Sequence, residues 1–327
     1  MSGDPPKVSV VIVGYDSLEF LMSCLSSVLK SHYPHFEVIY VDNGSTDAST
    51  EYFQTHAGKG SKSIQLDHNF GFTIANNIGA RSATGKYIVF LNVDTVVDSG
   101  WMDQLVAALE SDPSVGAAQP MLLQMDSNRV DSMGGFITPY GTVLSRGHGE
   151  PASEISGIEE VFYSKGAAMI TRRSLWESMG GFDPIFHLYF QETDYCWRLW
   201  AMGYRVICVP DSKVWHKGGV VLGRRPSLIK YYESRERLAL LLKNYSIQRL
   251  VRYLPITICF QIANVVRFLL RGSPASAANI MRGTICALTD LRAIWRRRRN
   301  FSADKVCENE ILKKLLAIQV IRTIREK

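Results

Sequence analysis

Residues 87–95, YIVFLNVDT, place a run of apolar residues directly ahead of Asn92 and Asp94. Such a run is typical of a strand that is buried on both faces of a parallel sheet. Ligands of open α/β sheets bind at the carboxyl ends of the strands. An aspartate at that place can hold a hard divalent cation, which in turn can hold a diphosphate. The stretch therefore predicts an α/β fold with a ligand-binding edge, although turns also use aspartate after a strand.

Strands and helices alternate through the first 120 residues. Apolar runs predict strands at 8–13, 37–41, 63–66, 87–91 and 115–119, and helical spacing predicts helices at 18–30, 47–54, 72–82 and 101–110. This alternation favours a mostly parallel, doubly wound sheet. Further strands are expected at 161–171, broken at Lys165-Gly166, and at 205–209 and 214–216, with a helix within 188–202.

Charge divides the chain near residue 223. Residues 224–327 hold 22 Lys and Arg against 7 Asp and Glu, a net charge of +15, whereas residues 1–223 carry a net charge of −9. We expect a globular domain at 1–223 and a basic amphipathic helical region at 224–327, with helices at 228–244, 254–270, 293–300 and 311–324. The segment 254–270 is shorter than the roughly 20 clean apolar residues that a membrane-spanning helix needs.

Three further polar clusters follow predicted strands: residues 14–16 (GYD), 42–47 (DNGSTD) and 68–72 (HNFGF). A carboxylate after the second strand suits a nucleotide base or ribose, whereas turn and helix-capping chemistry explains the same residues equally well. Asn77 and Arg81 lie four apart on the next helix, so they share a face and either reach a nucleotide or cap and pair. Polar endings on four consecutive strands point to one edge of the sheet.

With these motifs the chain resembles the inverting family 2 glycosyltransferases of the GT-A fold. The resemblance rests on VSVVIVGY (8–15), DNGSTD (42–47), NFGF (69–72), NNIG (76–79), GKYIVFLNVDT (85–95), GGFD (180–183) and QETDYCWR (191–198), in the order typical of the family. It covers about Val8 to Gly219, and rhamnosyl- and galactofuranosyltransferases are the most similar members. It implies a Rossmann-like sheet and the transfer of a single sugar from a nucleoside diphosphate sugar to a hydroxyl, with inversion.

The resemblance also implies a role for each polar cluster. Contacts with the donor fall on Tyr15, Asp42, Asn43, Asn69, Gly71, Asn77, Arg81, Asn92, Val93 and Lys165. The metal ligands fall on Asp94 and His216, with Mg²⁺ or Mn²⁺ as the cation. Asn92 departs from the family pattern, because most members have an Asp at the first position of an Asp-x-Asp pair.

The catalytic base of the family falls on Glu192, a position at which Asp is commoner. Asp194 and Arg198 lie four apart on the same predicted helix, so we expect an ion pair that gives structural support. A general base needs a carboxylate near the attacking hydroxyl, and Glu192 supplies one. The alternative is that Glu192 only complements the dipole of the first helical turn.

The expected partners are a dTDP- or UDP-sugar and the hydroxyl of a lipid-linked or other glycan acceptor in surface polysaccharide or glycoconjugate assembly. The basic helices suit an anionic membrane surface, and a homodimer that buries their apolar face is the alternative. This places the chain in the cytoplasm, peripheral to the inner face of the cell membrane. No nucleic acid is expected, because the sequence has no motif of a nucleic-acid-binding module.

Other function classes make different demands on the sequence. A non-catalytic nucleotide-sugar-binding scaffold would show damaged acidic motifs, and Asn92 and Gln191 are mild examples. A processive polysaccharide synthase would need several membrane spans. A dinucleotide oxidoreductase would need GxGxxG after its first strand, which residues 14–16 do not supply.

Overall fold

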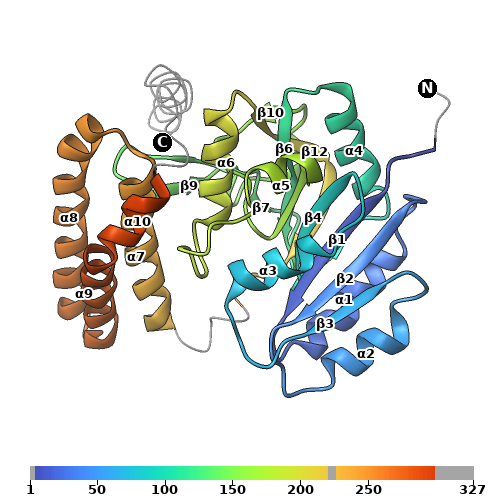
Figure 1. Cartoon of the computed structure of the whole chain (residues 1–327), viewed down its shortest axis with the longest axis horizontal. Helices are drawn as coiled ribbons and strands as arrows, with labels where there is room; N and C mark the ends of the chain where they lie inside the picture. Colours follow the sequence, from blue (N-terminus) through green and yellow to red (C-terminus); the bar gives the residue numbers. More distant parts are fainter. Residues whose placement is uncertain (1–3, 220–225, 299–327) are drawn as a thin grey trace. The chain divides into compact units, whose positions relative to one another are not determined.

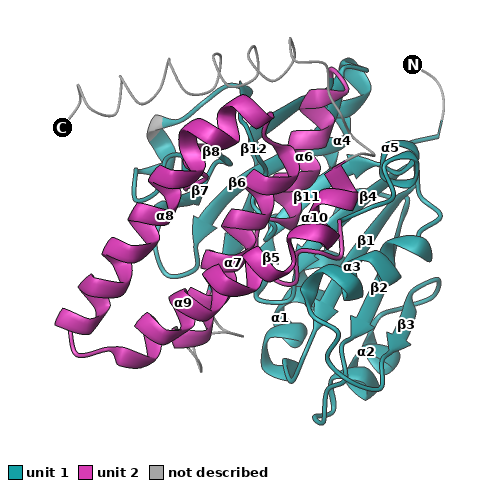
Figure 2. Ribbon diagram, turned by 60° about the vertical axis from the view of Figure 1, so that its left-hand side comes forward, with its two compact units in different colours: residues 1–135, 145–182, 204–218 teal, residues 136–144, 183–203, 219–327 magenta. Residues whose placement is uncertain are grey.

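The structure, a computed structural model, describes residues 4–219 and 226–298. It contains two compact units, coloured teal and magenta in Figure 2. Unit 1 comprises residues 1–135, 145–182 and 204–218, and unit 2 comprises residues 136–144, 183–203 and 219–327. These units do not follow one cut at residue 223, because two inner segments group with the basic helices. The helix predicted at 311–324 and residues 299–300 of the one before it lie outside the described residues.

A mixed sheet forms the core of unit 1 (Figure 1). Its strands are β1 (Val8–Gly14), β2 (Phe36–Asp42), β3 (Lys62–Gln65), β4 (Tyr87–Asn92), β5 (Thr95–Val97), β6 (Val115–Gln124), β7 (Val130–Ser132), β10 (Glu159–Glu160), β11 (Ala168–Arg172) and β12 (Arg205–His216). The order is β10-β12-β6-β11-β4-β1-β2-β3, with β5 on β12 and β7 on β6. Strands β1 to β4 are mutually parallel and β12 is parallel to β6, whereas β11 is antiparallel to both neighbours. The predicted mostly parallel sheet is confirmed.

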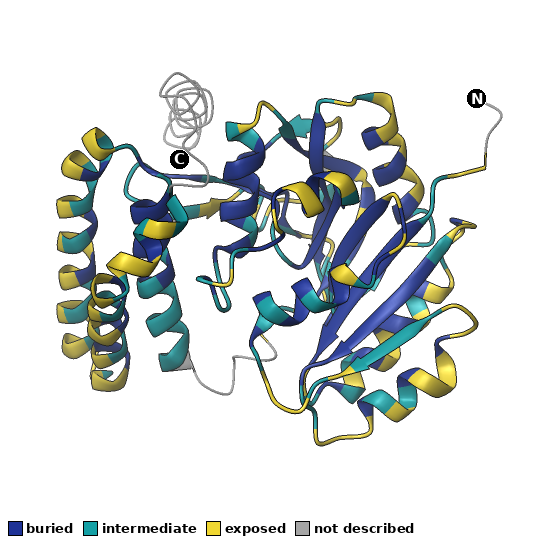
Figure 3. Ribbon diagram, viewed as in Figure 1, coloured by how far each residue is buried: buried dark blue, intermediate teal, exposed yellow. Residues whose placement is uncertain are grey.

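Helices cover both faces of this sheet: α1 (Leu18–Leu29), α2 (Ser49–His56), α3 (Phe72–Arg81), α4 (Trp101–Ser111) and α5 (Arg173–Ser178). Alternate residues of β1 divide between the faces. Ile12 joins a buried cluster with Leu25 of α1 and Leu105 of α4. Val11 faces α3 so closely that a Cβ on Gly79 would lie 2.5 Å from its Cγ1. Strand β1 is accordingly buried throughout, and β4 is buried up to its last residue, Asn92 (Figure 3).

Several predicted elements differ in extent from the structure. Of the strand expected at 161–171, only the part from Ala168 forms, as β11. Lys165 lies outside this strand, and its backbone N–H donates to the Gln119 side chain at 2.5 Å. The two strands expected at 205–209 and 214–216 are one strand, β12, whose register shifts between Val209 and Lys213.

Unit 2 is mainly helical, with α6 (Gln191–Ala201), α7 (Pro226–Asn244), α8 (Ile247–Leu270), α9 (Pro274–Thr289) and α10 (Leu291–Arg298). It also contains most of a hairpin formed by β8 (Gly135–Ile137) and β9 (Val143–Ser145). Helix α8 begins seven residues earlier than predicted and continues through Pro255. Helix α9 was not predicted, because its small residues weaken the apolar period. They also allow close packing, since a Cβ on Gly283 would lie 2.4 Å from the Tyr231 carbonyl oxygen of α7.

Candidate active site

The carboxyl ends of β1 to β4 meet at one edge of unit 1, as the polar clusters predict. In the parallel register Gly14 lies beside Asp42, Asp42 beside Gln65, and Asn92 beside Val13. The loops that leave these ends carry the candidate donor-binding residues. Tyr15 follows β1 and is 37% exposed, so its ring is accessible to a ligand.

The DNGSTD turn after β2 is held by its own polar side chains. The buried Asp42 carboxylate accepts the Ser45 N–H at 2.9 Å and the Thr50 hydroxyl at 2.5 Å. Gly44 adopts φ +81°, and a Cβ there would lie 2.6 Å from the backbone of His68. The turn therefore requires glycine, which other residues replace only with strain. The structure thus shows the turn chemistry of this motif directly, and a contact of Asp42 with a nucleotide stays a prediction.

Asn43 joins the second and third loops. Its amide nitrogen donates to Asn69 Oδ1 at 3.0 Å, and its amide oxygen accepts the Phe70 N–H at 2.9 Å. Asn69 Oδ1 also accepts the N–H of Gly71, which has φ +86° and precedes α3. These bonds give the third loop a defined shape at the sheet edge.

Asn77 and Arg81 occupy different places from those expected. The Asn77 amide donates to the Phe182 carbonyl at 2.8 Å and accepts the Phe182 N–H at 3.0 Å, so its amide is engaged in linking α3 to the GGFD segment. Arg81 ends α3, and three residues later Thr84 donates its N–H to Glu37 at the amino end of β2. Helix α3 therefore runs from the carboxyl edge of the sheet toward the amino edge, and Arg81 lies at its far end. The predicted donor contact of Arg81 is wrong.

Asp94 and His216 lie together, although they are far apart in the sequence. Strand β5 pairs with the end of β12, where Thr95 lies opposite His216, and the Lys217 N–H donates to the Asp94 carbonyl at 3.0 Å. His216 Nε2 is 3.6 Å from Asp94 Oδ1, and both side chains are buried. The strand pairing therefore brings the two predicted metal ligands to one point.

Asp131 is the main residue of this region that sequence reasoning missed. It lies on β7, which pairs with β6, and its Oδ2 is 2.8 Å from His216 Nδ1 and 2.7 Å from Lys165 Nζ. Burial opposes ionisation of Asp131, but the bond from His216 and the charge of Lys165 outweigh it and hold the pKa at about 2. Lys165, expected at a phosphate, is thus paired with a carboxylate. No motif marks Asp131, because its place depends on strand pairing.

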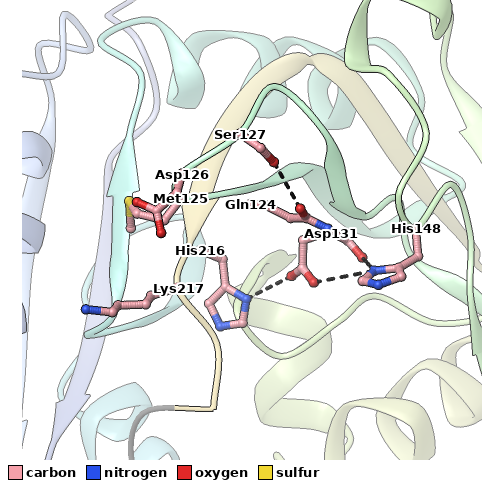
Figure 4. Close-up of a pocket in the computed structure, with 8 residues that line it drawn as sticks. All are labelled: Gln124, Met125, Asp126, Ser127, Asp131, His148, His216 and Lys217. Atoms are coloured by element: carbon pink, nitrogen blue, oxygen red, sulfur yellow. Dashed lines mark hydrogen bonds and ion pairs between the residues drawn. The ribbon is translucent and has the colours of Figure 1, made fainter.

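A cavity of about 360 Å³ opens beside these groups (Figure 4). It is lined by residues 124–127, Asp131, His148, His216 and Lys217. His216 and His148 flank Asp131 in this view, and His148 Nδ1 lies 2.9 Å from the Asp131 carbonyl oxygen. Polar and ionisable side chains dominate the lining, which suits a charged ligand better than an apolar one.

The donor set fits a divalent cation that is completed by a ligand's oxygens. Within the described residues no group of three or more His, Cys, Asp or Glu side chains could hold a metal by itself. Asp94 and His216 supply one oxygen and one nitrogen, and diphosphate oxygens or water would complete the shell. Asn92 Oδ1 at the end of β4 is buried and accepts no hydrogen bond from the described residues. Such an orphaned acceptor suits a ligand, because native proteins rarely leave one unpaired.

Glu192 lies in the first turn of α6, as predicted, but it groups with unit 2 rather than with the strands of unit 1. The helix begins abruptly, since Phe190 has φ +63° and its carbonyl accepts the Asp194 N–H at 2.8 Å. Left-handed backbone at an aromatic residue is strained, and such positions concentrate at functional sites. Glu236 of α7 holds the preceding loop, because its carboxylate accepts the N–H groups of His187 and Tyr189, each at 2.6 Å, and of Leu188.

The predicted ion pair of Asp194 and Arg198 is confirmed, with Arg198 Nε 2.9 Å from Asp194 Oδ2. Lys243 of α7 adds a second cation at 2.7 Å, and Asn244 donates to the same carboxylate at 3.0 Å. Lys243 also lies 2.7 Å from Asp183 of the GGFD motif, which Arg297 of α10 contacts at 2.6 Å. Burial opposes ionisation of Asp194, but Lys243 and Arg198 lower its pKa nevertheless.

Known proteins resemble the chain in sequence and in fold. It is 31% identical over 220 residues to the O-antigen biosynthesis protein RfbC of Myxococcus xanthus, a match that covers 64% of this chain and 17% of that protein. It is 24% identical over 217 residues to the poly-β-1,6-N-acetyl-D-glucosamine synthase of Staphylococcus epidermidis, covering 64% of this chain and 49% of the synthase. The chain thus spans less than half of the length of these curated relatives.

Solved structures share the fold at low identity. A mannosyltransferase from Pyrobaculum calidifontis in complex with GDP-Man and Mn²⁺ matches with a TM-score of 0.54 and 20% identity, over 96% of this chain and 88% of that one. TarS of S. aureus in complex with UDP-GlcNAc matches with a TM-score of 0.59 and 16% identity, over 90% and 89%. Residues 9–179 match the sequence family described as glycosyl transferase family 2, and the chain belongs to this family, as a glycosyltransferase of the GT-A fold.

Proposed function

We propose that the chain transfers a single sugar from a nucleoside diphosphate sugar to an acceptor hydroxyl in polysaccharide or glycoconjugate assembly, with inversion. The observation that carries this proposal is the convergence of Asp94 and His216 beside a polar cavity at the carboxyl edge of a nucleotide-binding type of sheet. The nucleotide sugars named with the structural neighbours, and the O-antigen and polysaccharide roles named for the relatives, support it.

The donor is proposed to lie along the strand ends. Tyr15 offers an exposed ring for a base. Asp42 and Asn43 hold the neighbouring loops through their own hydrogen bonds, and we propose that they also contact the base or ribose. Asn69 and Gly71 shape the third loop against it, and Asn92 with Val93 bounds the sugar diphosphate. Lys165 is proposed to pair with Asp131 rather than to contact a phosphate of the donor directly. The base is proposed to be uracil or thymine.

Asp94 and His216 would hold Mg²⁺ or Mn²⁺ against the donor. When bound, the cation supplies Lewis-acid stabilisation of the charge that develops on the leaving diphosphate. Asp94 provides a hard, negatively charged oxygen for it, and His216 provides a neutral nitrogen. The Mn²⁺ in the complex of the Pyrobaculum calidifontis mannosyltransferase supports a divalent ion, without deciding between the two metals.

Glu192 is proposed as the general base. Its carboxylate takes the proton from the acceptor hydroxyl while that oxygen attacks the anomeric carbon from the face opposite the leaving group. A single displacement of this kind inverts the anomeric centre and requires no covalent sugar intermediate. Asp194 and Arg198 support the helix that carries Glu192, since both charges are compensated inside unit 2.

A panel of nucleotide sugars tests the reaction. Release of free nucleoside diphosphate is measured for UDP-, dTDP- and GDP-sugars, with Mn²⁺ and with EDTA. We expect at least one UDP- or dTDP-sugar to be consumed, faster with Mn²⁺. Consumption that EDTA leaves unchanged would reject the metal, and a wild-type protein that consumes no donor but binds one would favour a non-catalytic scaffold.

We further propose that α8 and α9 bind an anionic membrane surface, which would bring the enzyme to a lipid-linked acceptor at the inner face of the cell membrane. Helix α8 is long and apolar enough to cross a membrane, and it is the only such helix among residues 4–219 and 226–298. Only 11% of its most apolar window is buried. Large apolar side chains on both helices are exposed: Ile247, Val251, Ile256, Phe260, Ile262, Val266, Leu269, Leu270, Met281, Ile285 and Leu288.

An orientation in the plane of the membrane fits unit 2 better than a spanning one. Thr257 of α8 donates to the Tyr140 carbonyl at 3.2 Å, and Gln261 donates to the Ser234 carbonyl of α7 at 3.1 Å. A spanning α8 would take the charged helix α7 with it. Residues 247–298 hold nine Arg and a single acidic residue, Asp290. Two copies of so basic a region would repel in a homodimer, whereas anionic headgroups attract it.

Vesicle flotation distinguishes membrane binding from homodimerisation. With phosphatidylglycerol vesicles the wild type should float, and it should float less with neutral vesicles or after Val251→Asp with Ile262→Asp. Met22→Asp, at an exposed apolar residue of α1 in unit 1, is the matched control and should float like the wild type. A wild type that stays unbound but elutes as a dimer, which the double variant abolishes, would reject the membrane in favour of the dimer.

A further inference from the structure

Asp131 stands at the centre of a small network of charges in unit 1. Its Oδ2 atom is 2.8 Å from His216 Nδ1 and 2.7 Å from Lys165 Nζ. An ionised carboxylate accepts hydrogen bonds and donates none. The hydrogen between Asp131 and His216 must therefore belong to His216 Nδ1.

This contact decides what the other ring nitrogen can do. A neutral imidazole with its proton on Nδ1 has its lone pair on Nε2. His216 Nε2 is the atom that faces Asp94, at 3.6 Å from Oδ1. Metal-bound histidines in proteins almost always donate their second N–H to a carboxylate, carbonyl or water, which fixes the ring and its tautomer. The row Asp131, His216, Asp94 has this arrangement.

We propose that Asp131 is a positioning residue that holds His216 in the Nδ1–H tautomer, so that Nε2 binds a divalent cation together with Asp94. The inference rests on the proposed roles of Asp94 and His216. It assigns Asp131 to the reaction although Asp131 contacts neither the sugar nor the cation. The Lys165 ammonium stabilises the anionic form of Asp131 through their 2.7 Å contact.

The tautomer can be measured without any metal. Side-chain ¹⁵N shifts of His216, at a pH where the ring is neutral, distinguish the two tautomers. We expect Nδ1–H in the wild type and a shift toward Nε2–H, the form favoured in water, in Asp131→Ala. A wild-type His216 that is already Nε2–H would overturn the proposal, whatever the enzyme transfers.

Metal affinity gives the second readout. Mn²⁺ is titrated in the presence of UDP, with free Mn²⁺ followed by electron paramagnetic resonance. Asp131→Ala should weaken Mn²⁺ binding about 10- to 100-fold. Asp131→Asn should lose less, because its amide oxygen still accepts from Nδ1–H.

Glu37→Gln is the matched control. Glu37 is a buried carboxylate of the same sheet, compensated by Lys7 and Lys62 at 3.2 Å each and also held at a pKa of about 2, but at the amino end of β2. The Mn²⁺ affinity of the Glu37→Gln variant should equal that of the wild type. If Asp131→Ala is folded by circular dichroism and binds Mn²⁺ within twofold of the wild type, Asp131 has only a structural role. If the wild type binds no Mn²⁺ with UDP, the proposed metal site itself is wrong. That result differs from one in which Asp131→Ala and the wild type bind Mn²⁺ equally well.

Discussion

Two carboxylates at the strand ends of unit 1, Asp42 and Asp94, differ in their partners from two carboxylates of unit 2, Asp183 and Asp194. At the strand ends of unit 1, Asp42 is held by a backbone N–H and a hydroxyl, and Asp94 by His216 at 3.6 Å. Neither forms an ion pair with a lysine or arginine among the residues that the structure describes. In unit 2, Asp194 contacts Arg198 and Lys243, and Asp183 contacts Lys243 and Arg297.

This difference separates binding carboxylates from structural ones. A carboxylate without a fixed cation in the protein attracts a mobile one, which suits a divalent metal and its diphosphate. A carboxylate that is fully buried between fixed cations is already compensated, and its removal leaves those cations unpaired. Substitutions of these two kinds of carboxylate should therefore affect different properties, stability at Asp194 of unit 2 and metal binding at Asp94 of unit 1.

The largest effect is expected at Asp194. Asp194→Asn removes a buried anion that Arg198 and Lys243 both contact, and leaves Lys243 with Asp183, so we expect the free energy of unfolding to fall by about 3–5 kcal/mol. Chemical denaturation followed by circular dichroism measures it. An unfolding free energy within 1 kcal/mol of the wild type, on the order of a surface substitution, would show that the network is not structural.

Glu192→Gln tests the same helix for chemistry rather than stability. The amide keeps the shape and cannot accept the proton, so turnover should fall about a hundredfold or more while donor binding is retained. Glu51→Gln is the control, since Glu51 also lies in a first helical turn, that of α2, and should leave turnover unchanged. Equal turnover in Glu192→Gln and the wild type would leave only the helix-dipole role for Glu192.

The pH dependence of stability should have opposite signs at two buried carboxylates. In unit 2, burial raises the pKa of Glu236 to about 7, against the lowering effect of three backbone N–H bonds. Because this folded pKa exceeds the ordinary 4.5, the contribution of Glu236 is present below pH 4.5 and is lost as pH rises to 7, about 3 kcal/mol in all. In unit 1, the pKa of Glu37 is about 2, so its contribution is present above pH 4.5 and is lost as pH falls toward 2.

Unfolding free energies of Glu236→Gln and Glu37→Gln between pH 3 and 8 check these signs. Glu236→Gln should flatten the change between pH 4.5 and 7, and Glu37→Gln should flatten it below pH 4.5. Unaltered slopes in either variant would contradict the assigned pKa of that residue.

The smallest effect on stability is expected at Asp94. Asp94→Asn removes only a 3.6 Å contact with His216, so the free energy of unfolding should change by less than about 1 kcal/mol. Thermal unfolding without metal measures this change. A loss as large as that expected for Asp194→Asn would mean that Asp94 is structural, and the contrast between the units would disappear.

Periodic sequence features predicted most of unit 1. Apolar runs located β1 to β4, and the parallel register then explains why their polar endings meet. The family resemblance identified Asp94 and His216 as a pair, and the pairing of β5 with β12 confirms that they lie together. Whether they bind a metal stays a prediction.

Other features depend on pairing that a single sequence does not encode locally. Asp131 reaches His216 only because β7 pairs with β6, and no motif surrounds it. Arg81 shares a helical face with Asn77, but spacing along a helix does not say which end returns to the sheet edge. The small residues of α9 give no apolar period, although they permit its close contact with α7.

The most direct test of the two kinds of carboxylate is one Mn²⁺ titration in the presence of UDP, applied to the wild type, Asp94→Asn and Asp194→Asn under conditions where all three are folded. We predict that Asp94→Asn loses Mn²⁺ binding by at least about tenfold, whereas Asp194→Asn binds like the wild type. Equal affinity of Asp94→Asn and the wild type, or a loss confined to Asp194→Asn, would contradict the account.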